Sequence, residues 1–594
     1  MSETRSGPRT IAELAEFTAG RFGEQVAARY KRDGEWREMT FAQARTRIDE
    51  LALGLVATGI APGDRVAILS DTRLEWTLVS LAVSAAGAVV VPVYPTNAAS
   101  ECQWVLGDSG ARLVVCEDAS QLAKIEQIRA ELPALAQVFV IDAADDSQSL
   151  DELATAGAGE DRAELTRRQA NVATDDIYTI IYTSGTTGPP KGTVLTHANA
   201  LSVADKVAAV GIIAEGDTLY LYLPLAHAFA LASLLAAYGL GAAIVYFGGD
   251  TRQILQELIE TKPTYVPSVP RVFEKLYGAA LKLQAQASDE ERQRFAQAIE
   301  IGGDFRRRIA RGERIPSELQ QAFDQADERL YQRVRGLFGG ELKQAITGAA
   351  PIAPEILEFF YACGVPVMEG WGMTETTAVA TVCTLDAFRF GTVGRTLPGV
   401  EIRIAEADGE ILIRGDNVFR EYWNNPEATA EAIADGWLHT GDIGEFDDDG
   451  YLKITGRKKD IIITAGGKNL APANIENDLK QSPFISQAVL HGDRRPYPVA
   501  LITLDSEEIL PWAADQGLPA DLKQLADADQ VVALVQAELD RANANYAQVE
   551  QIKRFAILKR DLSIEDGELT PTLKVKRSVV NERYAEVLDS LYAG

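Results

Sequence analysis

Residues 64–142 alternate between short apolar runs and longer amphipathic segments, and this alternation constrains the fold more than any other feature. Strands that alternate with helices form parallel βαβ units, because a parallel pair needs a crossover connection. The sequence therefore predicts an α/β fold with helices on both faces of its sheets, and a ligand site at the carboxyl ends of the strands. The predicted strands are DRVAIL, VVVPVY, ARLVVCE and QVFVID, and the predicted helices are EWTLVSLAVSAAGA, SECQWVLGDSG and ASQLAKIEQIRAEL.

The chain has 594 residues, which is too long for one hydrophobic core, so we expect at least two domains. Residues 274–345 are charged and helical, and we interpret them as a helical insertion, most simply a solvated hairpin with no catalytic part. A basic segment, GRKKDIII, begins at Gly456 and precedes a shorter α/β pattern. We predict a large domain of parallel and mixed sheets flanked by helices over residues 1–456, and a small α+β domain over residues 457–594.

Charge and composition exclude several classes of protein. The chain has 86 acidic and 58 basic residues, and nucleic acid is an improbable partner because phosphate binding needs a basic face. The four cysteines form no CxxC pair, which fits a reduced, cytoplasmic compartment, and the four histidines lack the spacing of zinc ligands. The N-terminal segment is charged where a signal peptide needs an apolar core.

One stretch, residues 218–249, contains no charged residue and is long enough to span a bilayer. Pro224, His227 and two glycines interrupt it, and basic residues do not cluster at its ends. We therefore predict a strand, a loop, a buried helix and a second strand there, and no transmembrane segment. Peripheral membrane contact and the oligomeric state stay open.

The strongest chemical signal lies in residues 177–197. A predicted strand, IYTIIY, leads into ten residues made only of Thr, Ser, Gly, Pro and Lys, after which Thr196 is expected to cap a helix. Glycines let backbone amides face an anion, hydroxyl groups add donors and Lys191 adds charge, so the segment suits a phosphate. It is not a Walker loop, because GxxxxGK[ST] cannot be fitted. A flexible surface loop is the alternative.

The segment Tyr182–Gly192, YTSGTTGPPKG, resembles the signature of the adenylate-forming superfamily, which includes acyl-CoA synthetases, aryl-CoA ligases, firefly luciferase and the adenylation domains of peptide synthetases. The resemblance covers nearly the whole chain, because further motifs follow in the order of that family. Each is weak alone, and together they are very specific. They are LPLAHAF (223–229), GAAP (348–351), EGWGMTET (369–376), WLHTGD (437–442), GRKKD (456–460) and TPTLKVKR (570–577).

The resemblance implies a site for the phosphates of ATP. The residues that it assigns to phosphate binding are Thr183, Ser184, Gly185, Thr186, Thr187, Gly188 and Lys191. It also implies that Thr374 contacts the phosphates and that Glu375 holds Mg²⁺, since a carboxylate beside a triphosphate requires a cation between them. A solvated surface carboxylate is the alternative for Glu375.

The resemblance also implies a nucleoside site. Gly348, Ala349 and Ala350 would line the adenine side. Trp371, which precedes Gly372, replaces the tyrosine that the family usually has there, so an aromatic platform for the adenine remains. Asp442 would accept hydrogen bonds from the ribose hydroxyls, with Arg457 also reaching the ribose. His227 would lie between the nucleotide and acyl pockets. A turn-forming aspartate and a buried core histidine are the alternatives for Asp442 and His227.

By the same resemblance, Lys574 is the catalytic lysine, binding the carboxylate and the α-phosphate during adenylation. Leucine precedes it where relatives commonly have glycine, a form that long-chain members often show. The alternative is a pair of lysines, Lys574 and Lys576, on an exposed alternating strand. The resemblance further implies that the C-terminal domain rotates about Lys459, so that the glycine loop with Gly466 forms a path for the pantetheine of coenzyme A.

The sequence thus predicts an AMP-forming ligase that uses Mg²⁺, ATP and coenzyme A to activate a fatty acid. SVPRVFEKLY (268–277), the helical insertion and TPTLKVKR resemble long-chain synthetases more than acetate or aryl ligases. Three alternatives remain: an acyl-AMP ligase that feeds a carrier protein, a luciferase-like oxygenase, and an inactive relative that only binds acyl groups or nucleotides.

Overall fold

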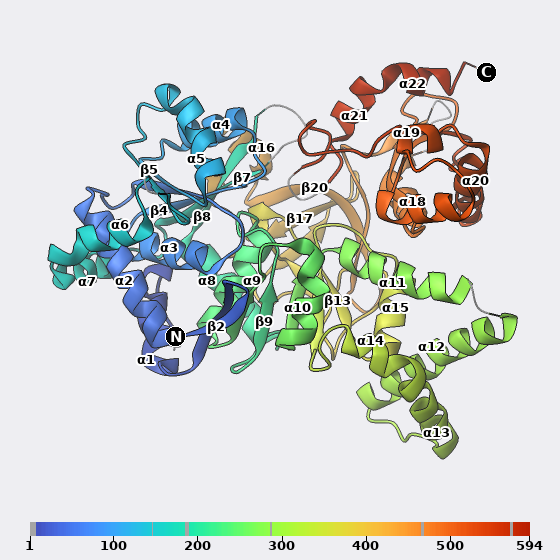
Figure 1. Ribbon diagram of the computed structural model, residues 1–594, viewed down its shortest axis with the longest axis horizontal. Helices are drawn as coiled ribbons and strands as arrows, with labels where there is room; N and C mark the ends of the chain where they lie inside the picture. Colours follow the sequence, from blue (N-terminus) through green and yellow to red (C-terminus); the bar gives the residue numbers. More distant parts are fainter. Residues whose placement is uncertain are drawn as a thin grey trace.

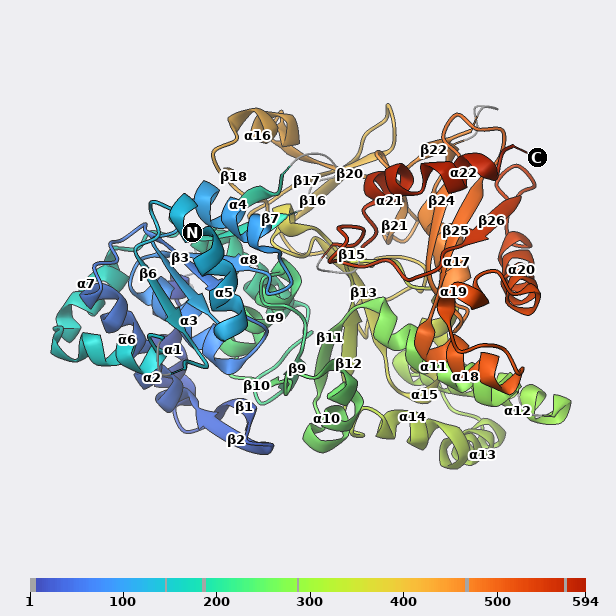
Figure 2. The same ribbon diagram turned by 45° about the horizontal axis from the view of Figure 1, so that its top comes forward.

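The structure is a computed structural model that describes residues 7–144, 147–183, 189–285, 288–464, 469–570 and 574–593 (Figure 1). A large body contains three sheets, and a smaller C-terminal part lies beside it. Figure 2 separates the sheets: β3 to β8 stand at one end, β9 to β13 in the middle, and β24 to β26 at the other end. The predicted α/β class is confirmed.

The described strands nearest the middle form a nine-stranded sheet in the order β15-β14-β13-β12-β11-β9-β10-β1-β2. It is mixed, because the six central strands are parallel to their neighbours and both edges are antiparallel. Its strands are β1 (Val26–Arg32), β2 (Glu35–Thr40), β9 (Thr218–Leu221), β10 (Ala243–Tyr246), β11 (Tyr265–Ser268), β12 (Gln344–Thr347), β13 (Val367–Trp371), β14 (Thr381–Val382) and β15 (Arg395–Thr396).

A second sheet has seven described strands in the order β18-β8-β7-β4-β3-β5-β6. The four strands predicted over residues 64–142 are present and parallel, and helices separate them as expected. The strands are β3 (Arg65–Leu69), β4 (Val89–Val93), β5 (Leu113–Cys116), β6 (Gln137–Val140), β7 (Ile177–Thr183), β8 (Lys191–Thr196) and β18 (Glu421–Tyr422).

The segment after β7 differs from the sequence prediction in one respect. We expected a loop from the strand directly to a helix, but the chain first returns along β7 as the antiparallel strand β8, with Thr183 opposite Lys191. The buried run of β8 was missed because it directly follows the proline and glycine residues. Thr196 caps the next helix as predicted, its hydroxyl accepting a hydrogen bond from the Asn199 N–H.

Helices cover the nine-stranded and the seven-stranded sheets of the large body (Figure 1). No helix in the described ranges is long and apolar enough to cross a membrane, and residues 218–249 form β9, α9 and β10 as expected. The helices are α1 (Leu14–Phe22), α2 (Phe41–Ala57), α3 (Leu74–Ala85), α4 (Ala99–Ser109), α5 (Ala119–Ile128), α6 (Leu150–Ala156), α7 (Arg162–Asn171), α8 (His197–Ala209), α9 (Ala228–Gly239), α10 (Ile254–Thr261), α15 (Pro354–Cys363) and α16 (Pro426–Ala432).

The insertion predicted over residues 274–345 is helical. It comprises α11 (Pro270–Ala285), α12 (Asp289–Ala310), α13 (Ser317–Ala326) and α14 (Gln332–Gly336), with one π-helical turn before α14. Aromatic rings from the insertion pack against α15: Phe295 stacks on Phe359, and Phe273 meets Phe360 edge to face. The insertion is therefore partly anchored in the core and is not a fully solvated hairpin.

A third sheet follows, made of β16 (Glu401–Ile404), β17 (Glu410–Arg414), β19 (Ile433–Ala434), β20 (Trp437–Phe446) and β21 (Leu452–Arg457). The C-terminal part then contains β22 (Ile462–Ile463), β23 (Asn469–Leu470), β24 (Ile485–His491), β25 (Val499–Leu504) and β26 (Arg554–Ile557). Its helices are α17 (Pro472–Lys480), α18 (Ser506–Asp515), α19 (Leu522–Leu525), α20 (Asp529–Asn543), α21 (Arg577–Arg583) and α22 (Ala585–Ser590).

The buried apolar clusters of the described residues divide on the two sides of residue 456. Three clusters draw only on residues up to Ile454, and two draw only on residues from Ile462 onward. Each side therefore has a hydrophobic core of its own.

Candidate active site

The carboxyl ends of several strands carry the predicted site residues. Thr183 ends β7, Gly348 follows β12 and Trp371 ends β13, while Asp442 lies within β20 opposite Arg457 of β21. Parallel strands present their carboxyl ends at one edge of a sheet, which is where open α/β sheets bind ligands.

Asp442 connects two of these elements. Its Oδ2 accepts a hydrogen bond from the indole Nε1 of Trp371 at 3.0 Å, and its Oδ1 lies 3.2 Å from Nε of Arg457. Burial raises the pKa of the Asp442 carboxyl, and the charges of Arg457 and Lys574 with the Trp371 N–H oppose that rise. The sequence placed all three residues at the nucleoside, and the direct contact between Trp371 and Asp442 is a feature that it did not show.

Lys574 comes from the C-terminal part and lies close enough to the large body for its charges to act on it. The protein surrounds the Lys574 ammonium, and this burial of the charge lowers the pKa of Lys574, although part of the residue is exposed to solvent. Arg457 lowers this pKa further, while Asp442 and Glu375 raise it. The structure thus brings Lys574 together with Arg457, Asp442 and Glu375 in one site.

The alternative, in which Lys574 and Lys576 share an exposed alternating strand, does not hold for the described residues. Among the described residues, Val575 makes only an isolated bridge to Leu569, and Lys576 is the N-cap residue of α21. Lys574 instead lies in a tight loop: its N–H donates to the Thr570 hydroxyl at 3.0 Å, and its carbonyl accepts from the Thr570 N–H at 2.8 Å.

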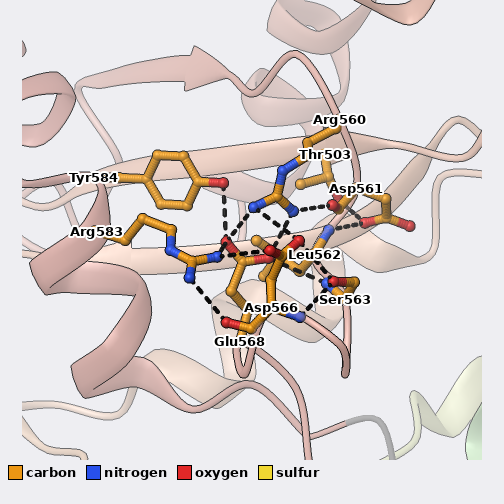
Figure 3. A network of polar contacts seen from close by, with 9 residues as sticks. All are labelled: Thr503, Arg560, Asp561, Leu562, Ser563, Asp566, Glu568, Arg583 and Tyr584. Carbon is orange, nitrogen blue, oxygen red and sulfur yellow. Dashed lines mark hydrogen bonds and ion pairs between the residues drawn. The ribbon is translucent and has the colours of Figure 1, made fainter.

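An ionic network centred on the buried Glu568 lies just before this loop in the chain (Figure 3). The Glu568 carboxylate accepts two hydrogen bonds from Arg560, both at 2.7 Å, and further bonds from Arg583 at 2.9 Å and Tyr584 at 3.0 Å. Burial alone would raise the pKa of Glu568, but these donors and the Ser563 N–H lower it to about 2. The backbone carbonyl of the same glutamate accepts from the Lys576 N–H at 2.7 Å. Glu568 therefore anchors both ends of the lysine loop.

Glu375 and Thr374 lie in a short 3₁₀ turn (Thr374–Thr376) beyond β13 and are buried. Oε1 of Glu375 accepts a hydrogen bond from the Tyr422 hydroxyl at 2.5 Å. The Lys191 ammonium lies 5.0 Å from the centre of the same tyrosine ring. Tyr422 therefore links the predicted cation ligand to the predicted phosphate lysine. Sequence reasoning missed it, since only the pairing of β18 with β8 brings it there.

His227 is the N-cap residue of α9. Its Nδ1 accepts a hydrogen bond from the Phe229 N–H at 3.2 Å, so that nitrogen carries no proton and Nε2 is the ring donor. Burial, with a smaller effect of the charge of Lys574, lowers the pKa of His227 to about 4. The imidazole is therefore neutral at pH 7 and lies within electrostatic reach of Lys574.

The backbone beside these groups is tightly constrained. Ala349 has a φ of +68°, a strained value for a residue with a side chain, and such strain concentrates at functional sites. A Cβ at Gly372 would lie 2.3 Å from the Ala378 carbonyl oxygen, so only glycine fits. Gly348 and Ala349 are half-buried and Ala350 is exposed, as a lining for a ligand requires.

The remaining predicted residues are exposed or lie outside the described residues. Lys459 is exposed in the turn between β21 and β22. Ser184, Gly185, Thr186, Thr187, Gly188 and Gly466 lie outside the described residues.

Comparison with known proteins agrees with this arrangement. Residues 15–423 match the AMP-binding enzymes, and residues 459–594 match the C-terminal domain of AMP-binding enzymes. The chain belongs to the family of AMP-binding enzymes. The resemblance stated from its motifs is confirmed.

Similar proteins in this family include fatty-acid ligases. The chain is 41% identical to the long-chain-fatty-acid–CoA ligase FadD15 of Mycobacterium bovis, over 98% of this chain and 99% of that protein. It is 31% identical to the long-chain-fatty-acid–CoA ligase ACSBG2 of Xenopus laevis, over 98% of this chain and 84% of the relative.

Solved structures of family members share the fold. The anthranilate CoA ligase AuaEII in complex with anthranoyl-AMP has a TM-score of 0.73 at 21% identity, covering 97% of each chain. ATP-bound MatB from Rhodopseudomonas palustris has a TM-score of 0.69 at 25% identity, covering 97% of this chain and 99% of MatB. The similarity extends through both the large body and the C-terminal part.

Proposed function

We propose that this AMP-binding enzyme joins a long-chain fatty acid to coenzyme A in two steps at one site. In the first, a carboxylate oxygen of the acid attacks the α-phosphorus of ATP, and acyl-AMP forms as pyrophosphate leaves. In the second, the thiol of coenzyme A attacks the acyl carbon and AMP leaves. The observation that carries the proposal is the convergence of Lys574, Asp442, Glu375 and His227 from both parts of the chain.

Each residue has a role in the first step that its surroundings support. Asp442, held by Trp371 and Arg457, suits the two ribose hydroxyls, because an ionised carboxylate accepts several hydrogen bonds. Trp371 gives the adenine an aromatic platform beside Gly348, Ala349, Ala350 and Gly372. Thr183, Thr374 and Lys191 suit the phosphates, and we assign residues 184–188, which lie outside the described residues, to the same role.

Glu375 fits a magnesium ion. Tyr422 holds its Oε1, and within the described residues Oε2 is left to face a hard cation, for which a carboxylate oxygen is a preferred ligand. When bound, Mg²⁺ would offset the negative charge of the triphosphate that repels a carboxylate. The chain's own part is to fix that carboxylate through Tyr422 and to place Lys191 over the ring of the same tyrosine.

Lys574 supplies positive charge where the carboxylate meets the α-phosphate. A positioned cation stabilises the charge that moves from the attacking oxygen to the leaving pyrophosphate. His227 remains neutral beside it, so it can donate a hydrogen bond from Nε2 without adding a second charge.

The second step needs a different surface at the same place. We infer that residues 457–594 form a mobile domain that rotates about Lys459, withdrawing Lys574 and bringing the loop with Gly466 to guide pantetheine. The separate hydrophobic cores on the two sides of residue 456 support this division into residues 1–456 and 457–594. The exposure of Lys459 supports its role as a hinge.

The choice of a long-chain acid rests on the relatives, whose names specify that substrate at 41% and 31% identity. A ligase that feeds a carrier protein remains a second candidate. We place the activity in the cytoplasm because the described cysteines are buried, reduced and sparse.

Pyrophosphate release with a panel of acids, with and without coenzyme A, tests the proposal. We expect release with long-chain acids, faster with coenzyme A, and acyl-CoA as the product. Pyrophosphate without acyl-CoA would favour the carrier-protein ligase, and no release with any acid would refute the proposed function.

A further inference from the structure

Helix α11 reaches from the insertion to the first turn of α18 in the C-terminal part, and both views place the two helices side by side (Figures 1 and 2). Arg271 Nη2 lies 2.5 Å from Asp505 Oδ2, and Lys275 Nζ lies 2.6 Å from Glu507 Oε2. Because Arg271 and Lys275 are four residues apart on a helix, both face the same partner. The two ion pairs therefore form one contact between the two parts.

The inner pair is shielded from solvent. The side chain of Asp505 is 9% exposed and that of Arg271 is 29% exposed, whereas Lys275 and Glu507 are 50% and 69% exposed. Asp505 is also the N-cap of α18: its Oδ1 accepts from the Glu507 N–H at 3.0 Å while Oδ2 meets Arg271. One carboxylate thus fixes the start of α18 and the position of α11 at the same time.

The pKa values of two glutamates in this contact, Glu274 and Glu507, reflect the basic residues around them. Glu274 lies between Arg271 and Lys275 on α11. Burial raises the pKa of Glu274, and the positive charges of Lys480 of α17 and Arg271 lower it. Hydrogen bonding from Lys275, with the charges of Lys275 and Arg271, lowers the pKa of Glu507. A Cβ at Gly278 would lie 3.7 Å from Cβ of Pro483, so the two backbones approach closely. The charges and the shape of α11 therefore match this face of the C-terminal part.

We propose that Arg271 and Lys275, paired with Asp505 and Glu507, are an ionic latch that holds the C-terminal part in the orientation that presents Lys574 to the active site. The inference rests on the proposed two-step function. Asp505, Glu507 and Lys574 all belong to the C-terminal part, so a rotation that withdraws Lys574 from Asp442 must separate the latch. The segment 268–277, which the reaction itself leaves unused, thereby gains a role as a set of positioning residues.

The latch makes a quantitative prediction about the two half-reactions. Each proceeds from one orientation, so the ratio of thioester formation to adenylation follows the equilibrium between the orientations. Loss of a latch contact multiplies the ratio of thioester formation to adenylation by a fixed factor. This factor is the same whether the adenylating or the thioester-forming orientation is more populated. We expect about two- to fivefold for the exposed pair, and about five- to tenfold for the shielded pair.

The experiment uses the full chain and measures both half-reactions. Adenylation is followed as pyrophosphate release with a long-chain acid, and thioester formation is followed in a single turnover with synthetic acyl-AMP and coenzyme A. The variants K275E and E507K each place like charges face to face, and the double variant K275E/E507K restores the pair in reverse. R271Q and D505N neutralise the inner pair, and asparagine keeps the N-cap acceptor of α18.

We expect the ratio to rise in K275E, E507K, R271Q and D505N and to return to the wild-type value in K275E/E507K. The matched control is R21E, which breaks the Arg21–Glu215 pair (3.3 Å, side chains 56% and 53% exposed) inside the large body and should leave the ratio unchanged. Thermal melting checks that each variant is folded. If R271Q does not fold, the variants of the exposed pair, K275E and E507K, still provide the test.

Three results would overturn the latch, and they can be told apart. An unchanged ratio in K275E and E507K, with both half-reactions active, would refute the latch while leaving the proposed function intact. A wild-type chain that releases no pyrophosphate with any acid would overturn the proposed function and the latch with it. A failure of K275E/E507K to restore the ratio would show that the single variants act through something other than their mutual charge.

Discussion

Replacing Glu568 by glutamine should destabilise the C-terminal part in a pH-dependent way. The carboxylate is fully buried and has a pKa of about 2, against an ordinary value of 4.5. The difference corresponds to about 3 kcal/mol of stability at pH 7. Because the folded-state pKa is depressed, this contribution is complete above about pH 4.5 and disappears as the pH falls through about 2. At about pH 3.5 we expect about 2 kcal/mol to remain.

Scanning calorimetry of the wild type and E568Q measures this effect. At pH 7 the melting temperature of the C-terminal part should be about 10 °C lower in E568Q than in the wild type. This difference in melting temperature should narrow toward pH 3.5. E565Q is the matched control, since Glu565 is an exposed carboxylate in the same loop, and its transition should not move. A gap that is absent at pH 7, or equal at both pH values, would refute the assignment of Glu568 as an ionised anchor of the lysine loop.

Three further predictions concern the reaction. E375Q should abolish pyrophosphate release at millimolar Mg²⁺ while leaving the melting temperature unchanged, because the cation ligand stabilises the transition state by several kcal/mol; near-normal release would contradict the assignment. Values of kcat/KM from acetate to stearate should rise to acids of about twelve carbons or more, since each buried CH₂ contributes about 0.8 kcal/mol; a maximum at a short or aromatic acid would refute long-chain specificity. K459P, which fixes φ near −65°, should slow overall turnover strongly and one half-reaction far more than the other; small, equal losses would place the hinge elsewhere.

Much of this architecture was predictable from local patterns. The alternation in residues 64–142 predicted the strands β3 to β6 of the second sheet and the helices between them, since period and β-branching act locally. The helix cap at Thr196 followed from its side-chain chemistry in the same way. The matches to family motifs brought Asp442, Glu375 and Lys574 together in one hypothesis, and the structure places them within electrostatic reach.

The features that were missed depend on distant pairing. Strand β8 and Tyr422 belong to the site through the β18–β8 ladder, which joins residues more than two hundred positions apart. The alternative of two lysines alternating on one strand failed because Lys576 stands at the start of α21 and its N–H bonds to the Glu568 carbonyl. The contact of Arg271 with Asp505 also joins two parts of the chain whose charges are unremarkable in the sequence alone.

The most direct test of the account separates the half-reactions in K574A. The Lys574 ammonium acts in adenylation and the other face of the domain acts in thioester formation, so K574A should lose acyl-AMP formation by about 10² to 10³-fold. Supplied with synthetic acyl-AMP and coenzyme A, it should form thioester at close to the wild-type rate. K576A is the control, and its effect should be mild because Lys576 stands at the N-cap position of α21 without a capping hydrogen bond from its side chain. Equal loss of both half-reactions in K574A, or a severe loss only in K576A, would contradict the two-orientation mechanism.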